Sequence, residues 1–305
     1  MYYPEFYKPE NTANWSYSPN ARNLVTAATD YRKYVEVAPA MCDSKRVLLL
    51  LIDVQKDFWH KEGALYVAGS SGEGAINDSR RIAEFIYREL PSITSVISTL
   101  DTHLPFQIFT PSFWMDQDGR PLLPHAMIDG EMQILRGSKP TGLLARVNPH
   151  MVDLIFKGTV MYEWLEKQTE FYCSQLVARD KPMLYVWPEH CQLGSAGHTL
   201  VGGVHEAILF HSYVREAQNK PVMKGDDPLS ECYSVFGPEI TESFDNSEPI
   251  AQKNNSFYEH VCSYSKIVIV GQAMSHCVRS SVDDLLLFME AKNPKLIKNV
   301  YILSD

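Results

Sequence analysis

The stretch RVLLLLID, from Arg46 to Asp53, decides the expected fold. A continuous apolar run that ends in a carboxylate is typical of a strand buried on both faces of a parallel sheet. Four further runs resemble it and a fifth is weaker: SVISTLD (95–101), PMLYVWPEH (182–190), KIVIVG (266–271), NVYILSD (299–305) and, more weakly, KPVMKG (220–225). The chain is therefore expected to build a mostly parallel sheet.

Helical patterns lie between these runs. In 78–90, apolar residues recur at helical spacing, with Asp78 placed to cap the start, and a second apolar stripe follows Cys277. Strands that alternate with helices predict right-handed βαβ units and a three-layer, doubly wound α/β fold. The predicted domain spans 46–305. Residues 1–45 form an extension that packs irregularly on it.

The interval 104–180 interrupts this alternation. It contains several prolines and one clear helical segment, at 160–178, so we expect an insertion at the rim of the domain.

Composition limits the classes of protein that the chain can belong to. Of 305 residues, 45% are hydrophobic and 21% charged, as in ordinary globular proteins. A net charge of −9 argues against nucleic acid as a partner, because phosphate binding needs clustered Lys and Arg. The six cysteines form no CxxC pair, and neither a signal peptide nor a membrane span is recognisable. We expect a cytoplasmic protein with free thiols.

Reactive side chains recur where the predicted strands end. In an open parallel sheet, ligands bind outside the carboxyl ends of the strands. The residues at those ends are Asp53, Asp101 with His103, His190, Lys224 and Cys277. Five strand ends that bring such groups to one edge predict a reactive site.

Cys277 is either a small core residue or a nucleophile. It opens a predicted helix, whose N-terminus stabilises a thiolate, and its backbone N–H with one from the preceding turn could bind an oxyanion. Asp53 could take the thiol proton, and Lys224 could stabilise the thiolate. The alternatives are that Asp53 only caps a turn and that Lys224 is a solvated loop residue.

Asp101 and His103 are two residues apart, so in extended backbone both side chains point the same way. Together with His190 they would give a zinc site that keeps open positions for water or substrate. The alternative is that both histidines are hydrogen-bonding loop residues. The other histidines, His276 among them, have no comparable setting.

The ordered set LLLIDVQKDF, STLDTH, WPEHC, VMKG and VIVGQAMSHCV resembles the isochorismatase-like cysteine hydrolases, most closely the nicotinamidases, over about 46–305. The resemblance implies a catalytic triad of Asp53, Lys224 and Cys277. It also implies a divalent metal, usually zinc, on Asp101, His103 and His190.

The same resemblance implies further features of the site. Phe58 would line the pocket for a pyridine ring, and the amides of Ala273 and Cys277 would bind the oxyanion beside a cis peptide at Gln272–Ala273. The activity implied is hydrolysis of nicotinamide to nicotinate and ammonia through a thioester on Cys277. The partner would be a small-molecule amide, and a homo-oligomer is left open.

Several positions depart from the family pattern. No further histidine follows His103 closely, Ser275 stands where the family often has an acidic residue, and the interval between His103 and His190 is wide. Relatives usually continue beyond the final LSD with another helix, so the chain is expected to be a truncated form. The competing predictions are a metal-free amidase or isochorismatase-type hydrolase and a non-catalytic protein of the same fold.

Overall fold

A computed structural model describes residues 3–303, and its central sheet is parallel throughout. In β1, the residues Leu48–Ile52 are completely buried, as a strand covered on both faces must be. The strands run in the order β10 (Val300–Ile302), β9 (Lys266–Gly271), β1 (Val47–Ile52), β2 (Ser95–Asp101) and β8 (Val222–Lys224). The predicted α/β class is confirmed. Asp305, the predicted end of the last strand, lies outside the described residues.

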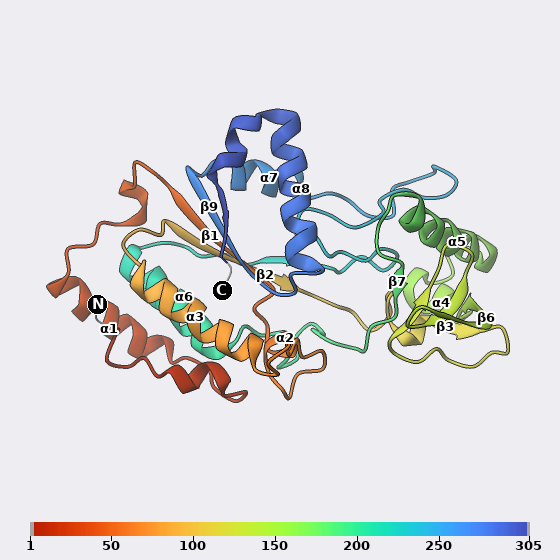
Figure 1. Cartoon of the computed structure of the whole chain (residues 1–305), viewed down its shortest axis with the longest axis horizontal. Coiled ribbons are helices and arrows are strands. Elements are labelled where there is room, and N and C mark those ends of the chain that lie inside the picture. Colours follow the sequence, from red (N-terminus) through yellow and green to blue (C-terminus); the bar gives the residue numbers. More distant parts are fainter. Residues whose placement is uncertain (1–2, 304–305) are drawn as a thin grey trace.

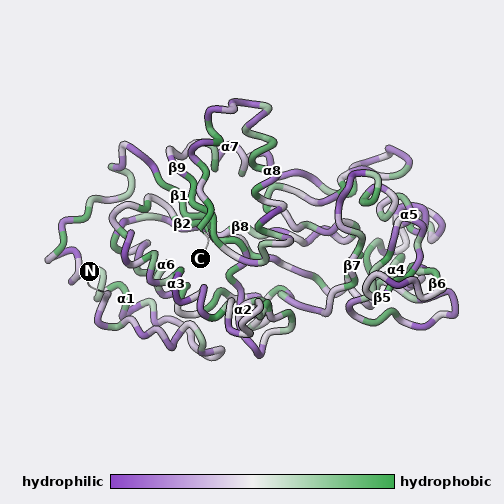
Figure 2. The backbone as a smooth tube through the Cα atoms, in the orientation of Figure 1, coloured by the Kyte–Doolittle hydropathy of each residue, from purple (hydrophilic) through white to green (hydrophobic). Residues whose placement is uncertain are grey.

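Helices cover both faces of this sheet (Figure 1). Side chains alternate along β1: Leu49 and Leu51 pack in the core beneath one helical layer, and Leu50 packs in the core beneath the other. The first layer contains α1 (Ala21–Tyr34), α3 (Gly74–Arg88) and α6 (Gly202–Arg215), and the second contains α7 (Asn255–Cys262) and α8 (Cys277–Lys292). The three-layer prediction is therefore confirmed, and Figure 2 shows hydrophobic residues gathered along the central strands.

The first 45 residues are more regular than expected. They contain α1, which Asn20 caps by accepting a hydrogen bond from the Asn23 N–H. Only Leu24 and Ala28 of this helix are fully buried, so its apolar period is too weak to recognise in the sequence. Helix α3 also begins earlier than predicted, at Gly74, so Asp78 lies within the helix and does not cap it.

A second, antiparallel sheet is formed mainly by strands within 104–180 (Figure 1). Its strands run in the order β3 (Trp114–Asp116), β6 (Lys139–Val147), β5 (Gln133–Arg136), β4 (Ala126–Ile128) and β7 (Leu184–Tyr185). Helices α4 (Met151–Phe156) and α5 (Tyr162–Ala178) complete this lobe, which has a hydrophobic core of its own around Trp114 and Tyr172. The helix predicted at 160–178 is α5.

The prediction that 182–190 forms a strand of the parallel sheet is wrong. Only Leu184 and Tyr185 form a strand, β7, and it pairs antiparallel with β4 of the second sheet. An apolar run this short fits either sheet, and Pro182 and Pro188 lack the N–H that a longer ladder needs. His190 therefore reaches the site from the second lobe. Among the described residues, no helix combines the length and apolarity needed to span a bilayer.

Candidate active site

Lys224 lies at the centre of a buried group of charges where the parallel strands end. Its Nζ is 3.1 Å from Asp53 Oδ2, 2.9 Å from Asp101 Oδ1 and 3.7 Å from Cys277 Sγ. It also donates to the Cys232 carbonyl at 2.9 Å. Asp53 follows β1, Asp101 ends β2, Lys224 ends β8, and Cys277 opens α8 after β9. Four predicted site residues are thus brought together by the sheet.

Local backbone geometry fixes the Asp53 carboxylate. Its φ of 50° turns the chain out of β1, while the Thr99 hydroxyl of β2 donates to Oδ1 and accepts the Asp53 N–H. Burial raises the pKa of Asp53 above its ordinary value, against the opposing pull of the Lys224 ammonium. A carboxylate with a raised pKa beside a thiol is suited to accept a proton.

Cys277 is a buried thiol rather than a preformed thiolate. Burial raises its pKa well above the usual range, Lys224 opposes this, and the negative charge of Asp53 adds to it. Burial acts to lower the pKa of Lys224, but Asp101 and Asp53 raise it well above its usual range. The nucleophile therefore needs a base, and Asp53 is beside it.

The turn before Cys277 contains a cis peptide at Gln272–Ala273, as the family resemblance implied. Ala273 and Cys277 line the same cavity. Their role in binding an oxyanion stays a prediction.

Asp101, His103 and His190 offer ligand atoms that all lie within 4.8 Å of one another, and the three side chains are buried. His103 Nδ1 is 3.0 Å from the Gly225 carbonyl and His190 Nδ1 is 2.7 Å from the Pro188 carbonyl, which places the proton of each ring on Nδ1. Both Nε2 atoms then face Asp101 Oδ2, at 3.0 and 3.8 Å. Two imidazoles with oriented second nitrogens and one carboxylate are a donor set that suits zinc.

The charges of these groups favour a cation. Burial acts to raise the pKa of Asp101, but its interactions with His103 and with the Lys224 ammonium hold it well below its usual range. Asp101 is therefore a carboxylate shared between Lys224, through Oδ1, and the two histidines, through Oδ2. One side chain links the cysteine group to the candidate metal site.

A cavity of about 280 Å³ opens above these residues. Its reactive side consists of Cys277, Asp101 and His190, and its walls are largely aromatic: Phe58, Tyr66, Trp187, Tyr233 and His276. Phe58, which was predicted to line the pocket, lies 5.4 Å from the His190 ring, centroid to centroid. The cavity has room for a small planar molecule beside the thiol.

No protein-family model matches the chain, and no curated protein sequence does. Solved structures that resemble it include a nicotinamidase/pyrazinamidase of Acinetobacter baumanii (17% identity, TM-score 0.44), which covers 80% of this chain and 79% of that one. A yeast nicotinamidase bound to the inhibitor nicotinaldehyde covers 85% and 100%, with 16% identity and a TM-score of 0.46. A zinc complex of a Pyrococcus horikoshii pyrazinamidase covers 85% and 99%, with 15% identity and a TM-score of 0.38.

Glu231 is a residue of the cavity that the sequence did not single out. Its carboxyl is buried, and burial raises its pKa to about 7, while His103 lowers that pKa and Asp101 raises it. It lies in an irregular loop, seven positions after Lys224, and so follows no apolar run that would mark it. His276 was also missed. Its ring packs between Trp187 and Tyr233, with centroid distances of 5.6 and 5.3 Å.

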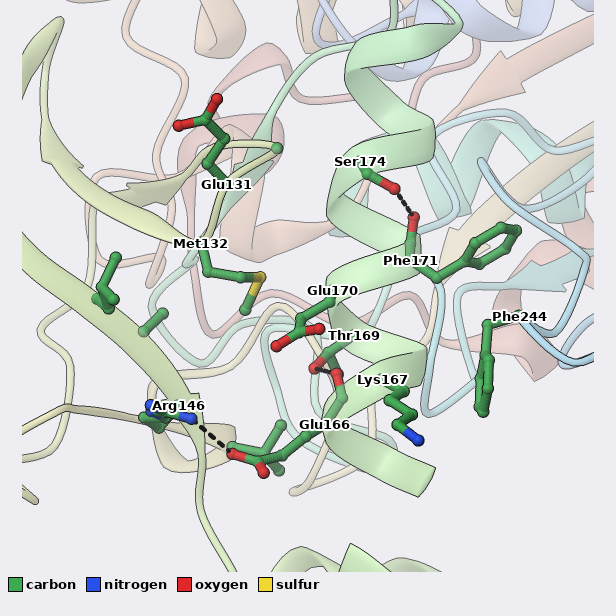
Figure 3. Close-up of a pocket in the computed structure, with 14 residues that line it drawn as sticks. Glu131, Met132, Arg146, Glu166, Lys167, Thr169, Glu170, Phe171, Ser174 and Phe244 are labelled. Carbon is green, nitrogen blue, oxygen red and sulfur yellow. Dashed lines mark hydrogen bonds and ion pairs between the residues drawn. The ribbon is translucent and has the colours of Figure 1, made fainter. Parts of the chain in front are cut away.

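A larger cavity, of about 640 Å³, lies in the second lobe between α5, β6 and the turn that precedes β5 (Figure 3). Arg146 and Glu166 approach each other across it, and Met132, Phe171 and Phe244 form its apolar surface. The described residues that line it include no cysteine or histidine. The smaller cavity is therefore the candidate active site.

Proposed function

We propose that the protein is a cysteine amidohydrolase that cleaves a small carboxamide, with nicotinamide as the first candidate. The observation that carries the proposal is the contact of one buried ammonium, Lys224, with both Asp53 and the Cys277 thiol at the floor of an aromatic cavity. A neutral thiol, an adjacent base and a flat apolar pocket are what acyl transfer from an aromatic amide requires.

The reaction proceeds in two halves. Asp53 accepts the thiol proton as Cys277 Sγ attacks the carboxamide carbon. The C–N bond then breaks as Asp53 passes the proton to the leaving nitrogen. Ammonia departs, and the acyl group stays on Cys277 as a thioester. In the second half Asp53 takes a proton from water, the hydroxyl adds to the carbonyl, and the sulfur leaves and recovers its proton. Lys224 stays charged throughout and offsets the negative charge near Sγ.

The residues present fit a divalent metal, with Zn²⁺ as the first choice, held by Asp101, His103 and His190. Such a metal would position the substrate through its ring nitrogen and polarise bound water. Phe58 and Trp187 would hold the ring in the plane that places its carboxamide over Cys277.

The same contacts support a second candidate, a metal-free hydrolase or amidase. His103 Nε2 and Asp101 Oδ2 are 3.0 Å apart, so a proton on Nε2 would satisfy both atoms without an ion. In that case the histidines shape the pocket and the substrate needs no ring nitrogen. Metal content measured on protein purified without added metal separates the two: empty and fully active protein supports this second candidate.

The test of the proposed function is ammonia release from nicotinamide, pyrazinamide and aliphatic amides of similar size. We expect turnover of the two aromatic amides and little of the aliphatic ones, because the cavity walls are flat and aromatic. Release from aliphatic amides alone would reject nicotinamide, and no release from any amide would reject the amidohydrolase.

The partner in this proposal is a small-molecule amide, and neither nucleic acid nor a membrane takes part. A cytoplasmic location and self-association stay predictions; light scattering of the purified chain tests the second.

A further inference from the structure

Among the described residues, three glutamine side chains are completely buried: Gln55, Gln107 and Gln168. A buried amide is costly unless its donors and acceptor are paired. Gln55 and Gln107 find their partners around the candidate metal site, whereas Gln168 lies in the second lobe. The role inferred for Gln55 and Gln107 rests on the metal that the proposed function includes.

Gln55 takes the place of a missing strand partner for Asp101. Strand β1 pairs with β2 as far as Leu51↔Ser98, and at Asp53 the chain turns away. The Gln55 side chain then fills the gap: Oε1 accepts the Asp101 N–H at 2.7 Å and Nε2 donates to the Asp101 carbonyl at 2.8 Å. Its amide thus imitates a backbone peptide, and it holds the first ligand residue at both of its backbone groups.

The second Nε2 hydrogen of Gln55 is also used. Nε2 donates to the His198 carbonyl at 3.0 Å, in the segment that follows His190. One side chain therefore ties the end of β2 to the chain that carries the third ligand.

Gln107 fixes the carbonyl on which His103 depends. Its Nε2 donates to the carbonyls of Gly225, at 2.8 Å, and Asp227, at 2.9 Å, while its Oε1 accepts the Leu104 N–H at 2.8 Å. The Gly225 carbonyl is the acceptor for His103 Nδ1. Gln107 thereby holds both the residue after His103 and the group that sets the tautomer of its ring.

The position of that carbonyl requires glycine. Gly225 has a φ of +86°, and a Cβ there would lie 2.7 Å from Asp101 Oδ1, well inside contact distance. Gln107 therefore holds a backbone carbonyl by hydrogen bonding. That part of the backbone can lie so close to Asp101 only because residue 225 has no side chain.

We propose that Gln55 and Gln107 are positioning residues that hold Asp101 and His103 at metal-binding separation. Neither touches the metal or the substrate. Removing either amide leaves the ligands present but frees Asp101 or His103 to move, and loss of such outer contacts costs about 10- to 100-fold in metal affinity.

The test is metal affinity of the full chain, stripped with a chelator and titrated with Co²⁺, whose visible absorption reports ligation directly. Gln55→Met and Gln107→Met remove the hydrogen bonds at similar volume, and we expect each to weaken Co²⁺ binding by about 10-fold or more. Gln168→Met is the matched control. Gln168 is equally buried and joins the Glu242 carbonyl, at 3.3 Å, to the Phe244 N–H, at 2.9 Å, and neither bond involves a ligand residue.

The control separates positioning from general loss of stability. Thermal unfolding of the metal-free variants shows whether each folds, and if Gln55→Met does not, Gln107→Met carries the test alone. Affinities equal to that of the parent, or equally weakened in Gln168→Met, would overturn the proposal while leaving the proposed function intact. A parent chain that binds no Co²⁺ instead rejects the metal itself, and with it this role of the glutamines.

Discussion

Residues from the parallel sheet and from the antiparallel sheet line or adjoin the same cavity, but they differ in how firmly strands hold them. Asp53, Asp101, Lys224 and Cys277 stand at or just after the ends of parallel strands that are held by a continuous ladder. Trp187 and His190 stand just after β7, a two-residue strand of the second lobe. We infer that the first sheet fixes the chemistry, whereas the second mainly shapes what is bound.

The largest expected effect concerns the parallel sheet. Cys277→Ala should lower the turnover of amides by about 10⁴-fold or more, since the nucleophile cannot be replaced, with the fold intact by circular dichroism. The matched control is Cys173→Ala, which removes another buried thiol, from the second lobe. Comparable turnover in both variants would contradict a catalytic Cys277 and favour the non-catalytic alternative.

The next effect is on stability. Lys224→Met leaves Asp53 and Asp101 as buried carboxylates without their cation, so the free energy of unfolding in urea should fall by about 3–5 kcal/mol. Arg179→Met, in the second lobe, breaks a contact of 3.2 Å with Glu242 in which both side chains are exposed, and should cost at most about 1 kcal/mol. Equal losses of unfolding free energy in the two variants would show that Lys224 is not specially coupled to Asp53 and Asp101.

A smaller effect depends on pH. Burial raises the pKa of Glu231 from 4.5 to about 7, so its contribution to stability is fully present below about pH 4.5 and is lost as pH rises through about 7. Glu231→Gln should therefore stabilise the metal-free protein by about 1–3 kcal/mol at pH 8, by urea unfolding, and by much less at pH 5. If Glu231→Gln stabilised the protein equally at pH 5 and pH 8, the stabilisation would not come from the raised pKa of Glu231.

The smallest expected effect concerns substrate binding by the second lobe. Trp187→Ala should raise KM for aromatic amides by about 10-fold, the loss of roughly one stacking contact, while kcat stays within a few-fold. Trp164→Ala, which removes a tryptophan of the same lobe bound to Asp245 at 2.8 Å, should change neither constant. A fall in kcat alone would mean that this lobe also takes part in the chemistry.

How far the sequence predicts the site depends on how each residue reaches the cavity. Asp53 directly follows an apolar run, Lys224 ends the weak one, and Cys277 opens the helix that follows a third. The geometry of a parallel sheet then brings such positions together. The sequence predicts His190 beside Asp101 and His103, where the structure has it, but through the wrong strand, because a short apolar run does not show which sheet it joins. Glu231 and Tyr233 lie in an irregular loop, where only the folded chain shows which side chains turn inward.

The central claim is that Cys277 carries the acyl group. The direct measurement is acid quenching during turnover of nicotinamide, followed by proteolysis and mass spectrometry of the peptide that contains Cys277. We predict that this peptide gains the mass of one nicotinoyl group, and that the gain is absent in Cys277→Ala. Ammonia release without an acyl group on that peptide, or with the group on another cysteine, would contradict the claim.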